Sequence, residues 1–556
     1  MKIKKYPSIV FIIFLSVFNS FGQHTQKIDS LFTSWNFPNH PGGSIMVVKN
    51  NKTIFSKAYG LASIEYNVTN STNTLFNIGS ISKQFTAMGI VLLEEQNKLS
   101  FEDDVRKHLP ELPDFGETIT IRHLLHHTSG LRDLHGLLGL AGWRRNDLET
   151  NEDLYRIIKN QKELNFKPGE EFLYCNTGYI LLAQIIERKS KSSFNDWMKK
   201  NIFDPLGMKN TYVEDQYDRV VANNTTSYYS QKEFKRAIES WGYFGSGNMH
   251  STTKNINLWL HNFINPREKW VTAFNKLLST TPLNNGYKTN YGFGVRIENH
   301  LEKKMIQHGG AVGGFRAVAR VYPEEQLQIV ILSNFSKSNI GSKIDKIAKI
   351  IFESNEKTQL KSITKKPQIS NQFIRLSNKK LKQFEGIYWS DIEKIGRKVY
   401  VKNDTLRYSS SETSEWPLVA IGKNTFEMLL RQYENPIVKF DGGTHQMIIT
   451  FSNGSPGIFE FLQSNQQQNT NDLTALVGDY YSSELKTTYS ILLKESDIYC
   501  EHIRHGKIKI KQLYNNIFSG GWPIGIIEIE RDKEGKVNGL RMSNGRTRNV
   551  WFKKVI

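Results

Sequence analysis

The sequence has few cysteines, no long apolar run after its first residues, and no dense basic segment. Two cysteines in 556 residues, Cys175 and Cys500, exclude a disulfide-rich scaffold and a cysteine-based zinc module. They lie far apart in the chain, so we expect two free thiols. The net charge is +19, but the basic residues are spread along the chain and no nucleic-acid-binding motif accompanies them. The excess therefore predicts a solvated basic surface, and we expect no nucleic-acid partner.

The first residues have the pattern of a secretory signal peptide. Three lysines among the first five residues precede an apolar run at 9–18, and Gly22 offers a small residue for cleavage. This run is too short to span a bilayer, and no later segment reaches about 18 uninterrupted apolar residues. We therefore expect removal of residues 1–22, a mature chain with no transmembrane segment, and a periplasmic or extracellular location.

Between residues 23 and 355, strand and helix signals are mixed. The strand signals lie near both ends of this region, at 43–48, 53–58, 291–298, 316–321 and 327–332. Most of the intervening sequence has helical periodicity. The simplest arrangement is an α/β sheet domain assembled from both ends of the region, with an all-α insert between them. The sequence therefore predicts an α/β plus all-α fold for residues 23–355.

A different pattern of short, aromatic-rich strands follows, and it occurs twice. The segment Gly-Ile-Tyr-Trp-Ser at 386–390 returns as Gly-Asp-Tyr-Tyr-Ser at 478–482, and Ser-Asn-Gly at 452–454 returns at 543–545. Each copy is long enough for a small antiparallel β-barrel or sandwich. The predicted boundaries are a linker at 356–378, a first repeat at 379–463, a connector at 464–471 and a second repeat at 472–556.

Ser80 and Lys83 stand at the start of a predicted helix. Apolar residues recur at helical spacing from Ser80 to about Gln96. Serine is a favoured N-cap, which is the ordinary interpretation of Ser80. Lysine three positions later is unfavourable, because the helix N-terminus carries positive partial charge. The same position suits a base, since the dipole and burial favour the neutral amine and residues three apart on a helix can reach each other. A serine with such a partner can act as a nucleophile.

Two further motifs fit this chemistry. Tyr174 and Asn176 follow a loop signal and precede a helical stretch, and His308 opens a glycine-rich segment between strand signals. Alone, each has a structural interpretation as a packed ring, a helix cap or a strand end. The Ser-x-x-Lys spacing also occurs elsewhere in the chain, so the inference depends on all three motifs in this order.

In this order the motifs resemble those of the serine β-lactamase and penicillin-binding-protein superfamily, especially its class C-like branch. That family carries Ser-x-x-Lys, then Tyr-x-Asn, then a Lys/His-x-Gly triplet on an edge strand. The repeats are similar to lipocalin-like barrels appended to some D-aminopeptidases. The resemblance to the superfamily covers about residues 25–355 and implies an antiparallel sheet flanked by helices, with a helical subdomain. It implies that Ser80 attacks a carbonyl and carries the acyl group, while Lys83 and Tyr174 move the protons.

The resemblance also implies how substrate is held. Asn176, His308 and Gly310 would bind the substrate, and the backbone N–H groups of Ser80 and Ala311 would form the oxyanion hole. One departure concerns His308, because lactamases of this type usually have lysine there. A permanent cation suits the carboxylate of penicillins, whereas histidine is mostly neutral at pH 7.

We therefore expect an exported serine hydrolase, a D-amino-acid peptidase, amidase or esterase. The alternatives are a β-lactamase and, in another class, a non-catalytic penicillin-recognising or glycan-binding protein. The expected substrates are small peptides, esters or lactams, including peptidoglycan stem peptides. No cofactor or metal is expected, because no Asp/Glu/Cys ligand pattern surrounds His126 and His127, which we expect to shape a turn.

Overall fold

The computed structural model describes residues 24–144, 146–229, 232–237, 241–359, 373–411, 414–430, 435–443, 445–451, 456–462 and 473–555. The predicted signal peptide at 1–22 and connector at 464–471 lie outside these residues, as does most of the predicted linker. The chain forms two compact units. The first comprises Met1–Glu95, Ile186–Ser279 and Tyr291–Gln368, and the second comprises Gln96–Ile185, Thr280–Asn290 and Ile369–Ile556.

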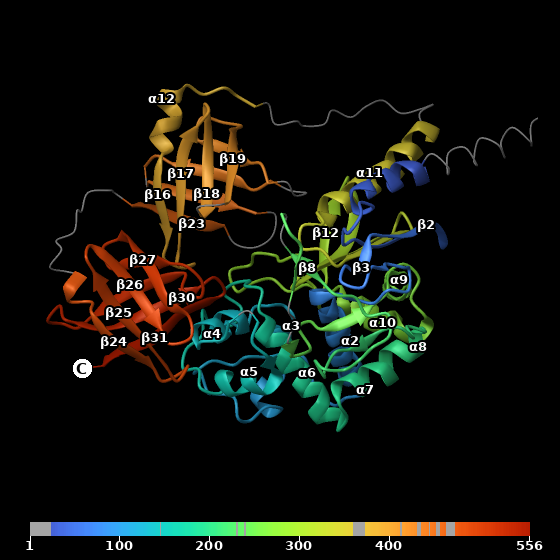
Figure 1. Ribbon diagram of the computed structural model, residues 1–556, viewed down its shortest axis with the longest axis horizontal. Coiled ribbons are helices and arrows are strands. Elements are labelled where there is room, and N and C mark those ends of the chain that lie inside the picture. Colours follow the sequence, from blue (N-terminus) through green and yellow to red (C-terminus); the bar gives the residue numbers. More distant parts are fainter. Residues whose placement is uncertain are drawn as a thin grey trace, which may run out of the picture. The chain divides into compact units, whose positions relative to one another are not determined.

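The first unit is built on a six-stranded sheet with strand order β12-β13-β14-β15-β1-β2 (Figure 1). Its strands are β1 (Gly43–Lys49), β2 (Lys52–Tyr59), β12 (Arg296–His300), β13 (Lys303–Val312), β14 (Phe315–Tyr322) and β15 (Leu327–Ser333). All neighbouring strands pair antiparallel, and they come from both ends of the region. The predicted sheet, assembled from distant parts of the chain, is confirmed.

Helices and short strands surround this sheet. The helices of the first unit are α2 (Ser82–Glu95), α7 (Phe194–Met198), α8 (Asp204–Leu206), α9 (Thr253–His261), α10 (Val271–Leu277) and α11 (Ile340–Gln359). The short strands are β3 (Leu61–Ser63), β4 (Val68–Thr69), β5 (Phe76–Asn77), β7 (Tyr212–Val213), β8 (Tyr228–Tyr229), β9 (Lys235–Arg236), β10 (Trp241–Gly242) and β11 (Met249–Ser251). α11 runs through Gln359 and so enters the segment predicted as a linker.

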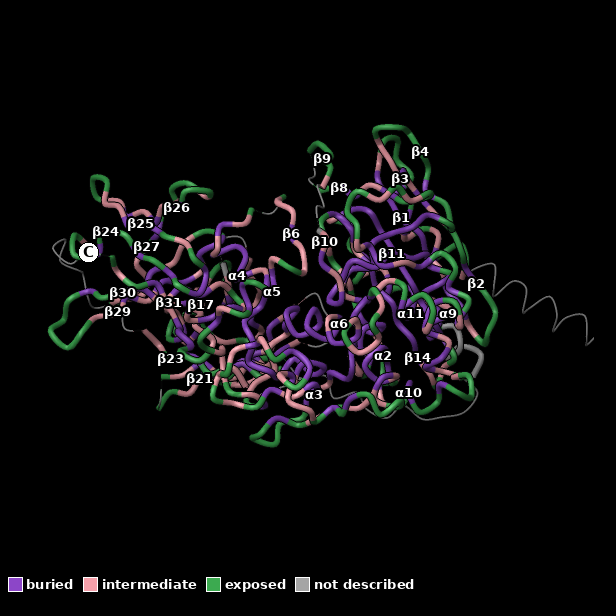
Figure 2. Tube along the Cα trace, turned by 90° about the horizontal axis from the view of Figure 1, so that it is seen from below, coloured by how far each residue is buried: buried purple, intermediate pink, exposed green. Residues whose placement is uncertain are grey.

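The two faces of the sheet follow the alternation of its side chains. On β1, Ile45 and Val47 are buried in the same apolar cluster as Ile344 and Ile347 of α11. The neighbouring Ser44 points to the other face, where its Oγ lies 3.2 Å from Thr253 Oγ1 at the start of α9. Figure 2 shows β1 and β14 largely in purple, as buried strands, and the exposed strand β4 in green, whereas β3 is mostly buried.

One predicted strand begins later than its pattern indicates. The prediction at 291–298 is wrong in its first half, because β12 begins at Arg296. Gly292 donates its N–H to Val295 O at 2.8 Å, which closes a turn. Gly294 has a φ of 75°, and a Cβ there would lie 2.7 Å from Gln84 N in the first turn of α2. The glycines thus serve a close backbone approach that alternation cannot reveal.

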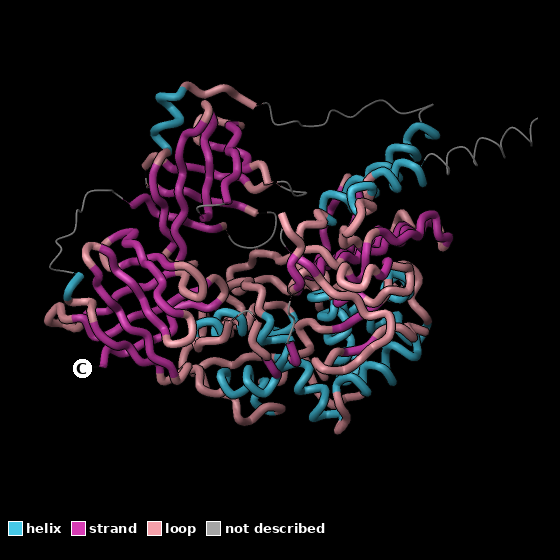
Figure 3. Tube along the Cα trace, viewed as in Figure 1, coloured by secondary structure: helices cyan, strands magenta, loops and turns pink. Residues whose placement is uncertain are grey.

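The second unit combines short helices with two closed barrels, drawn in magenta in Figure 3. Its helices are α3 (Ile121–Leu125), α4 (Leu134–Leu140), α5 (Asn151–Ile158) and α12 (Asn378–Leu381), with a short strand β6 (Glu149–Thr150), and α6 (Asn176–Ser190) begins in it. The first barrel contains β16 (Gly386–Ser390), β17 (Ile395–Lys402), β18 (Thr405–Ser411), β19 (Ser414–Ala420), β20 (Thr425–Met428), β21 (Ile437–Asp441), β22 (Gln446–Thr450) and β23 (Gly457–Leu462). The second contains β24 (Gly478–Ser482), β25 (Thr487–Lys494), β26 (Asp497–His502), β27 (Gly506–Tyr514), β28 (Ile517–Gly520), β29 (Ile526–Arg531), β30 (Val537–Asn544) and β31 (Thr547–Val555).

The sequence repeat is a structural repeat. In each barrel the first strand pairs with the last, which closes the sheet. The repeated tyrosine makes the same bond in both copies: Tyr388 donates to Phe384 O at 3.0 Å, and Tyr480 donates to Leu476 O at 2.6 Å. The predicted pair of antiparallel β-barrels is confirmed.

The structure also bears on the two cysteines and on membrane-spanning segments. Cys175 and Cys500 are both free, as expected, and both are buried. Among the described helices, none combines the length and apolar character needed to cross a bilayer.

Candidate active site

Ser80 lies in a sharp turn between β5 and α2, within a single turn of 3-10 helix, η2 (Gly79–Ile81). Gly79 has a φ of 51°, a left-handed conformation that favours glycine. Asn77 fixes the turn by accepting a hydrogen bond from Gly79 N at 2.9 Å. A Cβ on Gly79 would lie 2.8 Å from Ala311 N, so the turn contacts β13 directly. The predicted helix after Ser80 is confirmed, since α2 ends at Glu95.

Lys83 is fully buried, with 0% of its surface exposed. Its Nζ lies 3.2 Å from Ser80 Oγ and donates to Ser246 O at 2.6 Å. Thr86, one turn further along α2, donates to Gly245 O at 2.7 Å. The loop containing Gly245 and Ser246 therefore holds the first two turns of α2 and orients the amine toward the serine hydroxyl.

The strand β13 brings a pair of small residues against the serine turn. A Cβ on Gly310 would lie 2.0 Å from Ile78 O, a separation that no real side chain could adopt. Glycine at this position therefore lets the backbone of β13 touch the segment that carries Ser80. The two predicted oxyanion donors, the N–H groups of Ser80 and Ala311, belong to segments in direct contact.

β13 pairs with β12 from Lys303 to Gln307. His308 is the next residue of β13, just beyond this pairing. Its Nδ1 lies 2.7 Å from Gly309 O and its Nε2 lies 3.0 Å from Tyr291 Oη. A carbonyl can only accept, so Nδ1 carries the proton and Nε2 accepts from the tyrosine hydroxyl. Burial is the main cause that lowers the pKa of His308, to about 3. The imidazole is neutral at pH 7.

Tyr174 and Asn176 belong to the second unit, where Asn176 opens α6. The Tyr174 ring packs against His127, with 4.2 Å between ring centroids. Asp133 Oδ2 accepts from Asn176 N at 2.7 Å and from Asn176 Nδ2 at 3.0 Å. The guanidinium of Arg546 lies over the Tyr174 ring, 5.4 Å from its centroid. Asp133 thus holds the asparagine, while His127 and Arg546 contact the ring of the tyrosine.

The histidine pair has the structural role expected from the sequence. His127 has a φ of 61°, and its Nδ1 accepts from Cys175 N at 3.0 Å. His126 Nε2 lies 3.0 Å from Thr281 Oγ1. In the described part of the chain no group of three or more His, Cys, Asp or Glu side chains could hold a metal ion.

The predicted site residues divide between the two units. Ser80, Lys83, His308, Gly310 and Ala311 come together in the first unit. Tyr174 and Asn176 lie in the second unit, and their joint action with Ser80 stays a prediction.

Sequence reasoning did not find the residues that support these motifs. Three were missed: Tyr291, which donates to His308, Asp133, which holds Asn176, and Arg546, which contacts both Asp133 and Tyr174. Each is remote in sequence from at least one residue that it contacts, and no local pattern marks it.

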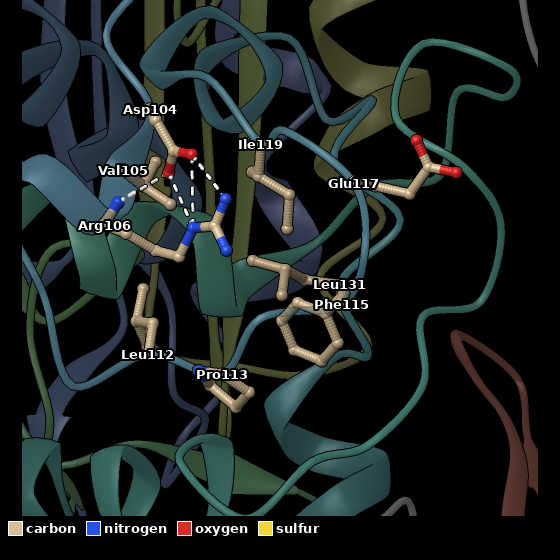
Figure 4. Close-up of a pocket in the computed structure, with 9 residues that line it drawn as sticks. All are labelled: Asp104, Val105, Arg106, Leu112, Pro113, Phe115, Glu117, Ile119 and Leu131. Carbon is tan, nitrogen blue, oxygen red and sulfur yellow. Dashed lines mark hydrogen bonds and ion pairs between the residues drawn. The ribbon is translucent and has the colours of Figure 1, made fainter.

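A small pocket elsewhere in the second unit has no comparable chemistry (Figure 4). Its lining is mainly apolar, with Leu112, Phe115 and Ile119 among its walls. Two of its charged residues form an ion pair with each other, since Arg106 Nη2 lies 2.7 Å from Asp104 Oδ2. No nucleophile paired with a base lines this pocket, so it is not the candidate active site.

The profile of the Beta-lactamase family matches residues 35–350, which is more than half of the chain. The chain belongs to the Beta-lactamase family. The resemblance drawn from the three motifs is thereby confirmed. Members of this family form a superfamily of serine hydrolases with the penicillin-binding proteins, and the antiparallel sheet with its helices is the fold of that superfamily.

Proteins similar to this chain include penicillin-binding proteins and enzymes named for D-amino-acid substrates. Penicillin-binding protein 4* of Bacillus subtilis is 32% identical over 333 residues, covering 56% of this chain and 71% of that protein. A D-aminopeptidase of Gluconobacter oxydans is 26% identical over 53% of this chain and 56% of its own length. The octameric penicillin-binding protein homologue from Pyrococcus abyssi superposes on 79% of this chain and 99% of its own, with a TM-score of 0.54 and 24% identity. The D-amino acid amidase of Ochrobactrum anthropi superposes on 61% of this Beta-lactamase family member and 99% of its own chain, with a TM-score of 0.50 and 20% identity.

Proposed function

We propose that the protein is an exported serine hydrolase that cleaves amide or ester bonds through an acyl-enzyme on Ser80, with D-amino-acid peptides, amides or esters as its substrates. The observation that carries this proposal is the buried Lys83 amine, 3.2 Å from Ser80 Oγ at the start of a helix. A fully buried lysine is costly unless it has a function or a compensating partner, and its partners here include the serine hydroxyl and a backbone carbonyl.

The acylation step follows from this arrangement. Ser80 Oγ attacks the carbonyl carbon of the substrate, and its proton passes to Lys83 or, through it, to Tyr174. The carbonyl oxygen gains negative charge and accepts from the N–H groups of Ser80 and Ala311. Each such donor is worth about 10²–10³ in rate. Collapse of the tetrahedral species expels the amine or alcohol, which takes up the proton, and leaves an ester on Ser80.

Water then hydrolyses the ester by the reverse proton path. The same base accepts a proton from water, and Ser80 Oγ leaves as a hydroxyl. Asn176 holds the amide of the substrate during both steps. Its amide nitrogen donates to Asp133, so its carbonyl oxygen is directed away from that carboxylate and is oriented to accept from a substrate N–H.

The charge of His308 favours a peptidase, amidase or esterase over a β-lactamase. The third motif of this chain supplies a neutral imidazole at pH 7, because the pKa of His308 is lowered to about 3. A substrate carboxylate therefore finds no cation at this position, in contrast to the lysine expected in a dedicated lactamase. The D-amino-acid class is supported by the D-aminopeptidase and D-amino acid amidase among its relatives.

A hydrolysis panel on purified protein tests the proposal. It contains a D-alanyl nitroanilide, the L-alanyl nitroanilide as a matched control, a short-chain nitrophenyl ester and a chromogenic cephalosporin. We expect turnover of the D-amide or the ester, a preference for the D over the L anilide, slow cephalosporin hydrolysis, and no turnover by Ser80→Ala. Equal turnover by wild type and Ser80→Ala would overturn the proposal, and rapid cephalosporin turnover would favour the β-lactamase alternative.

Export is tested separately. Expression in a bacterial host, fractionation and N-terminal sequencing should place the chain outside the cytoplasm with a new N-terminus at Gln23. Retention of residues 1–22 in the cytoplasm would contradict this part of the proposal.

A further inference from the structure

The hairpin between β30 and β31 of the second barrel contacts the start of α4. Asp133 donates its backbone N–H to Arg546 O at 3.1 Å, and Thr547 Oγ1 donates to Asp133 O at 2.7 Å. The approach is close: a Cβ on Gly136 would lie 2.4 Å from Thr547 Oγ1. The β30–β31 hairpin therefore packs against the start of α4 and is joined to it by backbone and side-chain hydrogen bonds.

Asp133, which this hairpin contacts, also holds Asn176. Asp133 has 2% of its side chain exposed, and its Oδ2 accepts both the backbone and the side-chain N–H of Asn176. Its Oδ1 accepts from His135 N at 3.2 Å, which caps α4. One buried carboxylate thus fixes both the start of α6 and the orientation of the Asn176 amide.

Arg546 provides the countercharge for this carboxylate. Its Nη2 lies 3.3 Å from Asp133 Oδ1, and its guanidinium covers the ring of Tyr174. Burial raises the pKa of Asp133, but the charges of Arg546 and His135 and the bond from Asn176 N outweigh burial and keep that pKa below its usual value. The carboxylate is therefore ionised at neutral pH, and Arg546 contacts both halves of the Tyr-x-Asn motif, one directly and one through Asp133.

The position of Arg546 is set by a second, buried group of contacts. Arg132 has none of its side chain exposed, and it donates to Glu484 Oε2 at 2.6 Å. It also donates to Arg548 O at 2.8 Å and Asn549 O at 2.9 Å, at the start of β31. These bonds attach the strand that follows Arg546 to the residue that precedes Asp133, so the hairpin cannot shift without breaking them.

We propose that Arg546 is a positioning residue for Asn176 and Tyr174, and that the second barrel thereby forms part of the hydrolase's working site. The proposal rests on the proposed function of the Tyr-x-Asn motif. It assigns a role to a repeat that lies more than a hundred residues beyond the catalytic motifs in sequence.

The experiment compares Arg546→Gln, Arg546→Lys and a matched control, Arg504→Gln, in the full chain. Arg504 lies on another hairpin of the same barrel, is similarly exposed at 40% against 36%, and pairs with Asp147 at 2.6 Å. The control removes an equivalent ion pair without touching Asp133 or Tyr174. The readouts are kcat and KM on a neutral nitrophenyl ester and on a carboxylate-bearing peptide, the melting temperature, and hydrogen exchange of peptides containing Asn176.

We expect Arg546→Gln to lower kcat/KM by about 10–100-fold on both substrates, because displacement of a substrate-holding group by about 1 Å has such an effect. Exchange at the Asn176 N–H should become several-fold faster, since the carboxylate that accepts it is no longer fixed. Arg546→Lys keeps the charge but loses the planar fork, so we expect partial rescue. Arg504→Gln should keep wild-type kcat and Asn176 exchange.

Three results would overturn the inference. Wild-type kinetics and unchanged Asn176 exchange in Arg546→Gln would do so. A loss confined to KM for the carboxylate-bearing peptide would make Arg546 a substrate ligand instead. An equal loss of kcat/KM in Arg504→Gln would show that any weakened contact of the second barrel lowers activity, with no specific role for Arg546. Should wild type itself neither turn over substrate nor depend on Ser80, the proposed function fails, and Asn176 exchange alone then decides the role of Arg546.

Discussion

Gly310→Ala should separate the oxyanion strand from the serine turn. A Cβ at this position would lie 2.0 Å from Ile78 O. Real Cβ contacts essentially never fall below 3.0 Å, so the backbone segments that carry Gly310 and Ile78 must move apart by about 1 Å. The affected atoms are backbone, which cannot rotate away as a flexible side chain could. Ala311 follows Gly310 directly and Ser80 lies two residues after Ile78, so the spacing of the two predicted oxyanion donors must change.

Gly310→Ala should lower the catalytic rate strongly. A displacement of about 1 Å can lower the rate by about 10²-fold, and loss of one oxyanion donor costs about 10²–10³-fold. We therefore expect kcat/KM on a nitrophenyl ester to fall by about 10²-fold or more.

The neighbouring glycine offers the control. A Cβ on Gly309 would lie 3.7 Å from Ala317 O, an ordinary van der Waals contact, so Gly309→Ala should stay within a few-fold of wild type. The assay is the ester kcat/KM of both variants, with their melting temperatures measured in parallel. Wild-type activity in Gly310→Ala would refute the argument that this contact sets the geometry of the site.

Three further predictions concern buried titratable side chains. Burial, with neighbouring carboxylates, raises the pKa of Glu149 to about 8. Between about pH 4.5 and pH 8 the folded state therefore binds a proton that the unfolded state has lost, so the stability of the folded state falls as the pH rises. The free energy of unfolding of Glu149→Gln, measured with denaturant, should exceed that of wild type by about 3 kcal/mol at pH 7 and equal it at pH 4. Because the pKa of His308 is lowered to about 3, the acid limb of the kcat/KM profile should show no step near pH 6.5 from this residue; a step at that pH that vanishes in His308→Asn would count against the neutral imidazole. Glu484→Gln leaves the fully buried Arg132 without its closest carboxylate and should destabilise the second unit by about 3–5 kcal/mol, measured as a lower melting temperature in calorimetry. An unchanged melting temperature would show that the pair contributes little.

Local patterns predict much of this molecule. Helical periodicity after Ser80 locates α2, and alternation locates β1, β2, β14 and β15 within a residue or two. The repeated tyrosine marks equivalent first strands of the two barrels, because each makes the same bond to a carbonyl four residues earlier. These features depend on residues close in sequence, so the sequence displays them.

The remaining features depend on contacts between distant segments. β12 begins later than its alternation indicates because Gly294 must lie against α2. Arg546 and Asp133 are separated by 413 positions, and neither residue stands in a recognisable motif. A single sequence records which residues are present, but not which carboxylate a given arginine will reach after folding.

The most direct test of the central claim is the site and rate of covalent labelling by a fluorophosphonate. Peptide mapping by mass spectrometry should place the adduct on Ser80 in wild type and find none in Ser80→Ala. Lys83→Met should label at least about 10²-fold more slowly, because the base that removes the proton is lost. An adduct on another residue, or equal labelling rates in wild type and Lys83→Met, would contradict the claim that a buried amine activates this serine.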